Sequence, residues 1–239
     1  MKRSLGLALL LVSGGVAPAL GQDPRDAVIL DPTHHHVILE NDHVRIFEVL
    51  AAPGDTSPMH THPPLVVISL DKARLRMKVP DGSTSILDLN PAQVLWLENV
   101  EHSWELLSGQ VHLIAVEVKA ARDGLTPAAI VPLDQEAVVV DPTHHHVVME
   151  NDHVRVFEAL AGPGESSPMH THPPTAIISV DAARMRMTLP DGSSSIFDLH
   201  PAQALWIEEV EHSWDIVSGL LQAFGVEVKA ARDGPKPSR

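Results

Sequence analysis

The sequence predicts an all-β protein made of two tandem jelly-roll domains, and two observations carry this prediction. Residues 27–124 match residues 137–234 without a gap, at an offset of 110 positions and with about two thirds of the positions identical. A repeat of this length is a duplicated domain and not a solenoid unit. Within each copy, short apolar or alternating segments recur roughly every ten residues with turn signals between them, which is typical of a β barrel or jelly roll.

The elements can be followed in the first copy. Residues 37–39 and 44–50 flank a polar turn and predict a hairpin. Residues 65–70 (LVVISL) form a continuous apolar run, which indicates a buried strand, whereas residues 73–79 alternate apolar and charged side chains, as in a strand with one wet face. Further strands are expected at residues 85–89, 94–97, 103–107 and 111–118. The few helical candidates are short, such as residues 119–123.

Composition narrows the classes of function. The chain has 239 residues, of which 44% are hydrophobic and 3% aromatic, and it has no cysteine and no tyrosine. The core must therefore be aliphatic, and disulfides cannot stabilise it. The formal net charge is −14. This acidity argues against nucleic acid or an anionic membrane surface as a partner.

The first 21 residues resemble a cleavable signal peptide. Lys2 and Arg3 precede an apolar run at residues 5–12 that is too short to span a bilayer, and small residues stand at Ala19 and Gly21. We expect cleavage before Gln22 and a periplasmic or secreted bacterial protein without a membrane segment afterwards. An uncleaved anchor is the alternative.

The expected domains are residues 22–130 and 131–239, with a linker near residues 126–132 and a disordered tail after residue 234. The two copies should pack as an intramolecular pseudo-two-fold pair, like a dimer of single domains. Further oligomerisation stays open.

The clearest candidate site is a pair of histidines two residues apart. Gly54 opens a turn, and His60 and His62 follow it in a segment of strand-like sequence. Side chains two apart on a strand point to the same face, so both imidazoles can converge on one point. A third histidine, His102, comes later in the first copy, and the matching set in the second copy is His170, His172 and His212.

These residues resemble the cupin superfamily. The spacing from Gly54 to His62 matches the first cupin motif, G-x5-H-x-H, and residues 90–102 resemble the second, a Pro-Gly-Asp-like turn and strand that end at a histidine. The chain is thus similar to a bicupin, with two double-stranded β-helix domains on one polypeptide. Each half also resembles small single-domain bacterial cupins.

The chain departs from that pattern at one ligand. The family's first motif places a glutamate four or five residues after the second histidine, where this chain has Val66 or Val67, and Ala176 or Ile177 in the second copy. Any role that the family gives to that glutamate is in doubt here. The remaining ligand set is three neutral histidines, similar to that of thiol-dioxygenase-like cupins.

Three imidazoles suit a divalent transition metal such as Zn, Fe, Cu, Ni or Mn far better than Mg²⁺ or Ca²⁺. Three protein ligands leave positions open for water or for another ligand. With no anionic protein ligand the metal keeps its full charge, which favours a small anionic molecule as partner. The alternative is that His-Thr-His forms a polar turn without metal.

Other polar residues give weaker signals. Strand alternation would put the outer two of His34, His35 and His36 on one face, and the same holds for their copies. They are expected to form a solvated strand edge; the alternatives are that they line the mouth of the barrel or hold a second metal. His43 and His153 are expected in exposed hairpin turns. Glu101 should point away from the metal, and Trp104 either walls the site or packs in the core. The arginines are expected to make surface pairs, with binding of an anionic substrate as the alternative; they are Arg45, Arg74, Arg76, Arg155, Arg184 and Arg186.

Three functions stay open on the sequence alone. The leading hypothesis is an exported metal-binding bicupin, for which the resemblance implies oxygenase- or isomerase-type chemistry on a small anionic molecule. The alternative is a non-catalytic module that binds a small ligand or sequesters metal, in which case the triple histidines should also load metal. The third is an interaction domain with vestigial histidines.

Overall fold

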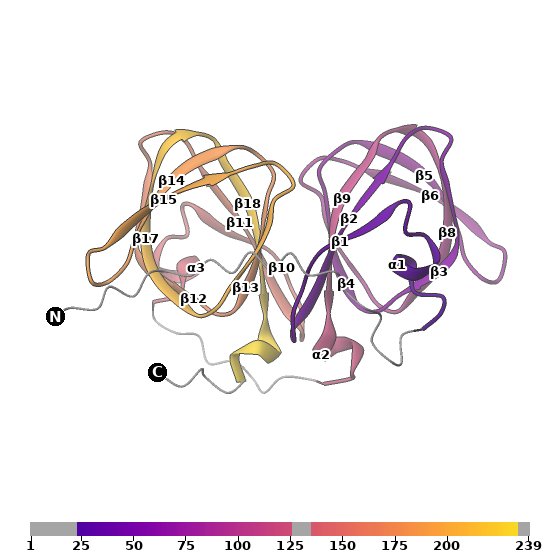
Figure 1. Ribbon diagram of the computed structural model, residues 1–239, viewed down its shortest axis with the longest axis horizontal. Helices are drawn as coiled ribbons and strands as arrows, with labels where there is room; N and C mark the ends of the chain where they lie inside the picture. The colour runs from indigo at the N-terminus through magenta and orange to yellow at the C-terminus, as the bar shows by residue number, and fades with distance from the viewer. Residues whose placement is uncertain (1–22, 126–134, 234–239) are drawn as a thin grey trace.

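The computed structural model describes residues 23–125 and 135–233. These segments form two similar halves that lie side by side (Figure 1). The predicted signal peptide, the predicted domain boundary between residues 130 and 131 and the predicted tail lie outside the described residues and stay predictions.

Each half consists of two antiparallel sheets. In the first half the five-stranded sheet has the order β1-β2-β9-β4-β7 and the four-stranded sheet the order β3-β8-β5-β6. The elements are α1 (Ala27–Leu30), β1 (His35–Glu40), β2 (Val44–Ala51), β3 (Thr56–His62), β4 (Leu65–Ser69), β5 (Ala73–Lys78), β6 (Thr84–Leu89), β7 (Val94–Leu97), β8 (Val100–Gly109), β9 (Val111–Val118) and α2 (Lys119–Arg122).

The second half repeats this arrangement. Its sheets have the orders β10-β11-β18-β13-β16 and β12-β17-β14-β15. The elements are α3 (Ala137–Val140), β10 (His145–Glu150), β11 (Val154–Ala161), β12 (Ser166–His172), β13 (Thr175–Ser179), β14 (Ala183–Thr188), β15 (Ser194–Leu199), β16 (Ala204–Ile207), β17 (Val210–Gly219), β18 (Leu221–Val228) and the 3₁₀ turn η1 (Lys229–Asp233).

The prediction of an all-β fold with two tandem jelly-roll domains is confirmed. The expected hairpin is the antiparallel pair β1–β2, and the short helix α2 lies where it was expected. Among the described residues the strands of each half form two separate sheets and not one closed barrel. No helix in the described ranges is long and apolar enough to cross a membrane.

Both faces of β4, which lies within the five-stranded sheet, are buried, and this explains its continuous apolar run. Leu65 and Val67 point into the space between the two sheets of the half, where they pack with Trp104. Val66 and Ile68 point the other way and belong to a core cluster that includes residues of both halves. Because no face of this strand meets water, its sequence does not alternate.

Reciprocal contacts join the two halves. His43 stacks on Trp206 of the second half at a ring-centroid distance of 5.4 Å, and Trp96 stacks on His153 at 5.8 Å. The matching pair of contacts supports the expected pseudo-two-fold packing of the two copies. His43 and His153 are therefore half-buried at the interface, and the expectation that they are exposed was wrong.

Candidate metal centre

Two strands of the four-stranded sheet bring the three predicted histidines together. His60 and His62 lie two apart on β3, and His60 stands directly opposite His102 on β8. The Nε2 atom of His60 is 3.1 Å from that of His62 and 3.0 Å from that of His102. In the second half, the Nε2 atoms of His170 and His172 are 3.2 Å apart, and the ring of His212 lies 4.7 Å from that of His170.

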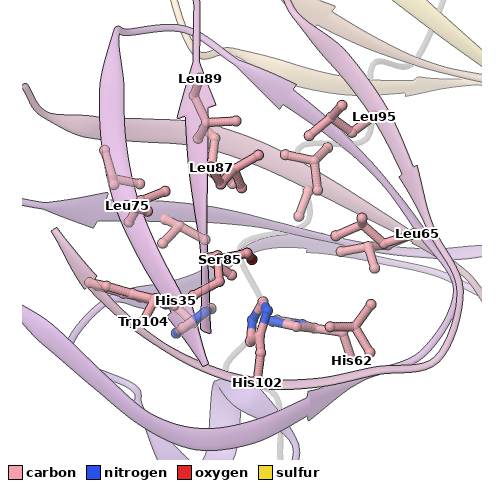
Figure 2. A pocket seen from close by; sticks show the side chains of 18 of the residues that line it. His35, His62, Leu65, Leu75, Ser85, Leu87, Leu89, Leu95, His102 and Trp104 are labelled. Carbon is pink, nitrogen blue, oxygen red and sulfur yellow. The ribbon is translucent and has the colours of Figure 1, made fainter. Parts of the chain in front are cut away.

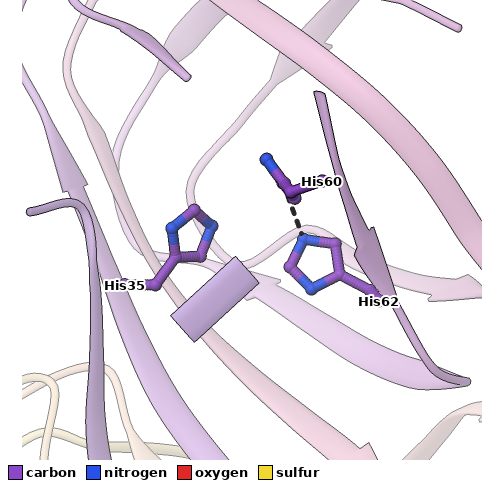
Figure 3. A group of neighbouring side chains, drawn as sticks. All are labelled: His35, His60 and His62. Atoms are coloured by element: carbon purple, nitrogen blue, oxygen red, sulfur yellow. Dashed lines mark hydrogen bonds between the residues drawn. The ribbon is translucent and has the colours of Figure 1, made fainter. Parts of the chain in front are cut away.

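A fourth histidine, which the sequence analysis did not assign to the site, joins each group. His35 is the first residue of β1, and its ring centroid lies 5.0 Å from that of His60 (Figure 3). Its possible ligand atom lies within 4.8 Å of those of His60 and His62. His145 takes the same place in the second half.

The three adjacent histidines, His34, His35 and His36, therefore have three different environments, which the sequence analysis did not predict. Only the middle residue, His35, faces the inside and is 4% exposed. His34 precedes β1 in a turn, where its Nδ1 lies 2.9 Å from Asp31, and His36 is exposed. The expectation that the outer two histidines share a face was wrong because the strand begins only at His35.

The hydrogen bonds of the rings fix which nitrogens face one another. The Nδ1 of His60 lies 2.8 Å from the backbone oxygen of Pro58, so Nδ1 carries the hydrogen and Nε2 carries a lone pair. The Nδ1 of His35 likewise donates to the backbone oxygen of Asp31 at 3.1 Å. The Nε2 lone pairs of these two rings are therefore free to bind a metal.

The ring of His62 leaves a buried nitrogen without a hydrogen-bond partner. The Nδ1 of His62 makes no hydrogen bond, and neither does the equivalent atom of His172. If Nδ1 carries the hydrogen, the Nε2 lone pairs of His60 and His62 face each other at 3.1 Å; if Nε2 carries it, Nδ1 is a buried acceptor without a donor. A cation bound to the converging Nε2 atoms would remove the repulsion in the first arrangement, so these residues fit a metal.

Burial keeps the rings neutral, which is the protonation state that metal binding requires. Burial lowers the pKa of His35 to about 3, with a further contribution from the charges of His62 and His60. It lowers the pKa of His62 to about 3 as well. In the second half, burial brings the pKa of His212 to about 3.

A hydrogen-bonded carboxylate supports the first histidine of the pair. The Ser57 hydroxyl lies 3.0 Å from the Nδ1 of His60 and donates a hydrogen bond to Asp31. Asp31 is 6% exposed and also contacts His34. Ser167 and Asp141 make the corresponding bond in the second half. Such outer contacts orient a ligand ring.

The family's glutamate has no substitute on the inner side of β4. Val67 fills that position and lines the space beside the histidines, while Val66 faces the other half. The nearest carboxylate to His62 is that of Glu117, whose Oε1 lies 3.9 Å from Nδ1, on the side of the ring opposite Nε2. The converging donors are therefore imidazole nitrogens alone.

Glu117 belongs to a buried ion-pair network. Arg45 donates to Glu117 at 2.8 Å and to Asp26 at 2.6 Å, and all three residues are less than 9% exposed. Arg155 makes the same contacts with Glu136 and Glu227. The expectation that Arg45 and Arg155 make surface pairs was wrong, because these side chains point between the two sheets.

The other arginines follow the expectation. Arg74 pairs with Asp88, and Arg76 pairs with Glu105, at the surface. The same holds for Arg184 with Asp198 and Arg186 with Asp215. Glu101 points away from the histidines, as expected, and pairs with Arg25.

A cavity of about 300 Å³ adjoins the histidines of the first half. His35, His62 and His102 lie at one end of it, with Trp104 beside them, and Leu89 lies toward the other end (Figure 2). Trp104 thus walls the site and also packs in the core. A polar group of a ligand in this cavity would bind at the histidine end.

No protein-family model matches this chain, and neither does any curated protein sequence. Among solved structures, an oxalate decarboxylase from Lactobacillus farciminis in complex with formate superposes with a TM-score of 0.51 at 13% identity, covering 85% of this chain and 79% of that one. A Bacillus subtilis oxalate decarboxylase gives 0.50 at 14% identity, covering 85% and 71%. A cupin 2 conserved barrel domain protein from Leptotrichia buccalis gives 0.49 at 11%, covering 82% and 88%.

At these identities the likeness concerns the fold. Each half of the chain has the cupin fold, with two facing antiparallel sheets and the inward-facing histidines between them. The protein is therefore a bicupin by fold, as its motifs predict.

Proposed function

We propose that this bicupin binds one divalent transition metal in each half and uses the open positions of that metal to bind and convert a small molecule. The observation that carries the proposal is the convergence of the Nε2 atoms of His60, His62 and His102 within a buried site, repeated in the second half. His35 and His145 supply a further nitrogen to each group.

The donor set narrows the metal. Imidazole suits Fe, Ni, Cu and Zn, whereas Mn prefers sites with oxygen donors, and no carboxylate lies among the converging ligand atoms. A bound ion would act as a Lewis acid that polarises its ligand. Burial around it holds the rings neutral, and Ser57 and Asp31 fix the orientation of His60.

Metal sequestration is the weaker alternative. A storage protein would load the triple histidines as a second site, yet His35 already belongs to the first site and His34 contacts Asp31. His36 is exposed without a neighbouring group of possible ligands among the described residues. The arrangement therefore favours one metal per half and a ligand beside it.

Metal content tests this proposal. We expect about two equivalents of transition metal in untagged mature protein, and near-complete loss in a variant carrying His60→Ala, His62→Ala, His170→Ala and His172→Ala. Circular dichroism of the variant controls for folding. If folded wild type and variant contain the same trace amounts, the protein has no metal function.

We also propose export. The apolar run at residues 5–12 and the small residues before Gln22 support a signal peptide. Cell fractionation with N-terminal sequencing should give a periplasmic or secreted protein that begins at Gln22. A cytoplasmic protein that retains Met1 or Lys2 would refute this.

A further inference from the structure

The cavity beside the first metal centre is apolar almost throughout. Among the described residues, its polar lining consists of the three histidines at one end and Ser85, and no Asp, Glu, Lys or Arg side chain lines it. The remaining lining residues are aliphatic or aromatic and come from both sheets. The inward arginine, Arg45, does not line the cavity, because Glu117 and Asp26 hold its side chain.

The outer part of the cavity is apolar as well. Val79, directly after β5, lines the cavity and is 37% exposed, whereas Ile86 stands opposite Arg76 on the outer face of β6. An apolar side chain is thus retained where the cavity meets solvent. A ligand that enters beside Val79 passes apolar side chains before it reaches the histidines.

This distribution of polarity limits the ligand. A charged group in the body of the cavity would lose its hydration without gaining a partner, which is costly. A charged or chelating group at the histidine end would instead meet the metal. Hydrocarbon filling the rest would gain free energy from its removal from water.

We propose that the first centre takes a ligand with two parts: a head group that chelates the metal as a monoanion, and an apolar chain or ring that fills the cavity between β4, β6 and β8. This rests on the metal-binding function proposed above and specifies its substrate class. Small dianions such as oxalate have no apolar part to fill this cavity and are therefore a poor match for it.

The second half offers natural control substitutions. The histidines are kept, but the walls differ: Leu87 is replaced by Phe197, Leu75 by Met185 and Leu113 by Ala223. Because the same fold already accommodates Phe197 in β15, Leu87→Phe is a change that the first half can be expected to tolerate. It places a larger ring in the wall without touching a histidine.

The test uses straight-chain hydroxamates as probes, because a hydroxamate is a monoanionic chelator whose tail can be lengthened one carbon at a time. The protein is the full chain with His170→Ala and His172→Ala, loaded with Co²⁺, so that the visible spectrum reports the first centre. From acetohydroxamate to octanohydroxamate, Kd should fall about fourfold per methylene until the cavity is full. Oxalate should bind no more tightly than acetohydroxamate.

In Leu87→Phe, the advantage of the longest tails should shrink at least tenfold, while the Kd of acetohydroxamate and the cobalt spectrum stay unchanged. Equal Kd values along the series, with a normal cobalt spectrum, would overturn the two-part ligand and leave the metal centre standing. A cobalt spectrum that never develops would overturn the metal centre and this proposal together.

Discussion

At the scale of single residues, His35 and His36 are neighbours in β1 with opposite environments. His35 is buried beside His60 and His62, and His36 is exposed. We expect His35→Ala to weaken metal binding in the first half by at least tenfold, about 1.4 kcal/mol, because it removes one converging nitrogen. Competition with a chelator on protein lacking the second centre measures this.

His36→Ala is the matched control, since it removes the same side chain one position along. It should leave the metal affinity within twofold of wild type. Equal effects of the two substitutions would show that His35 acts only through the strand and not as a ligand.

Arg45 and Arg74 form a second contrast between buried and exposed groups. Burial lowers the pKa of Arg45, but the bonds to Glu117 and Asp26 outweigh it and the pKa is raised. Arg45→Met would leave two buried carboxylates without their cation, and we expect a loss of about 3–5 kcal/mol in the free energy of unfolding. Urea denaturation of the metal-free protein measures it.

Arg74→Met removes the exposed pair with Asp88 and should cost about 1 kcal/mol or less. If Arg45→Met were equally mild, the buried network would contribute no more than a surface pair.

At the scale of elements, much of the site could be predicted because it depends on local strand geometry. Two histidines two apart on β3 must share a face, and the G-x5-H-x-H spacing places them after a turn. The role of His35 could not be predicted, since its face depends on where β1 begins. The partners of Arg45 could not be predicted either, because Glu117 is 72 positions away in β9.

A glycine in β18 positions a ring against the second centre. Phe157 stands opposite Gly225, and a Cβ added to Gly225 would lie 2.1 Å from the Cζ of Phe157. The same ring stacks on His172 at 5.3 Å. Gly225→Ala should therefore displace Phe157 and cost about 1–3 kcal/mol of stability.

The first half supplies the reciprocal control, because Ala115 already stands opposite Phe47. Ala115→Gly should cost about 1 kcal/mol or less, as expected for glycine in a strand, and should not lower metal affinity. Unfolding curves and cobalt titration of both variants decide this, and a neutral Gly225→Ala would show that Phe157 can move without consequence.

At the scale of the whole molecule, the duplication builds a shared core as well as two sites. The outer faces of the five-stranded sheets form one cluster that includes Val66 and Val226, so neither half can expose that face to water without cost. The continuous apolar run at residues 65–70 predicts a strand that is buried on both faces. The sequence could indicate what covers the outer face, namely the other half, only through the duplication.

The buried histidines make the stability of the metal-free protein depend on pH. Their pKa values in the folded state lie near 3 for His35 and His62 and near 4 for His145, below the unfolded value of 6.5. Above pH 6.5 these histidines are neutral in both the folded and the unfolded state, so they make no contribution to the pH dependence of the free energy of unfolding. Below that pH, the unfolded chain binds protons that the folded chain does not, so unfolding becomes easier as the pH falls, by up to about 1.4 kcal/mol per pH unit for each histidine.

We therefore expect the free energy of unfolding of chelator-treated protein to fall by several kcal/mol between pH 7 and pH 5, measured by urea denaturation. A variant with His35→Gln and His62→Gln should show a flatter dependence, and His36→Ala should follow wild type. Metal adds to the effect in the loaded protein, because protons compete with it for the same nitrogens. If the double variant and wild type lost stability in parallel, other groups than these buried histidines would govern the acid sensitivity of the fold.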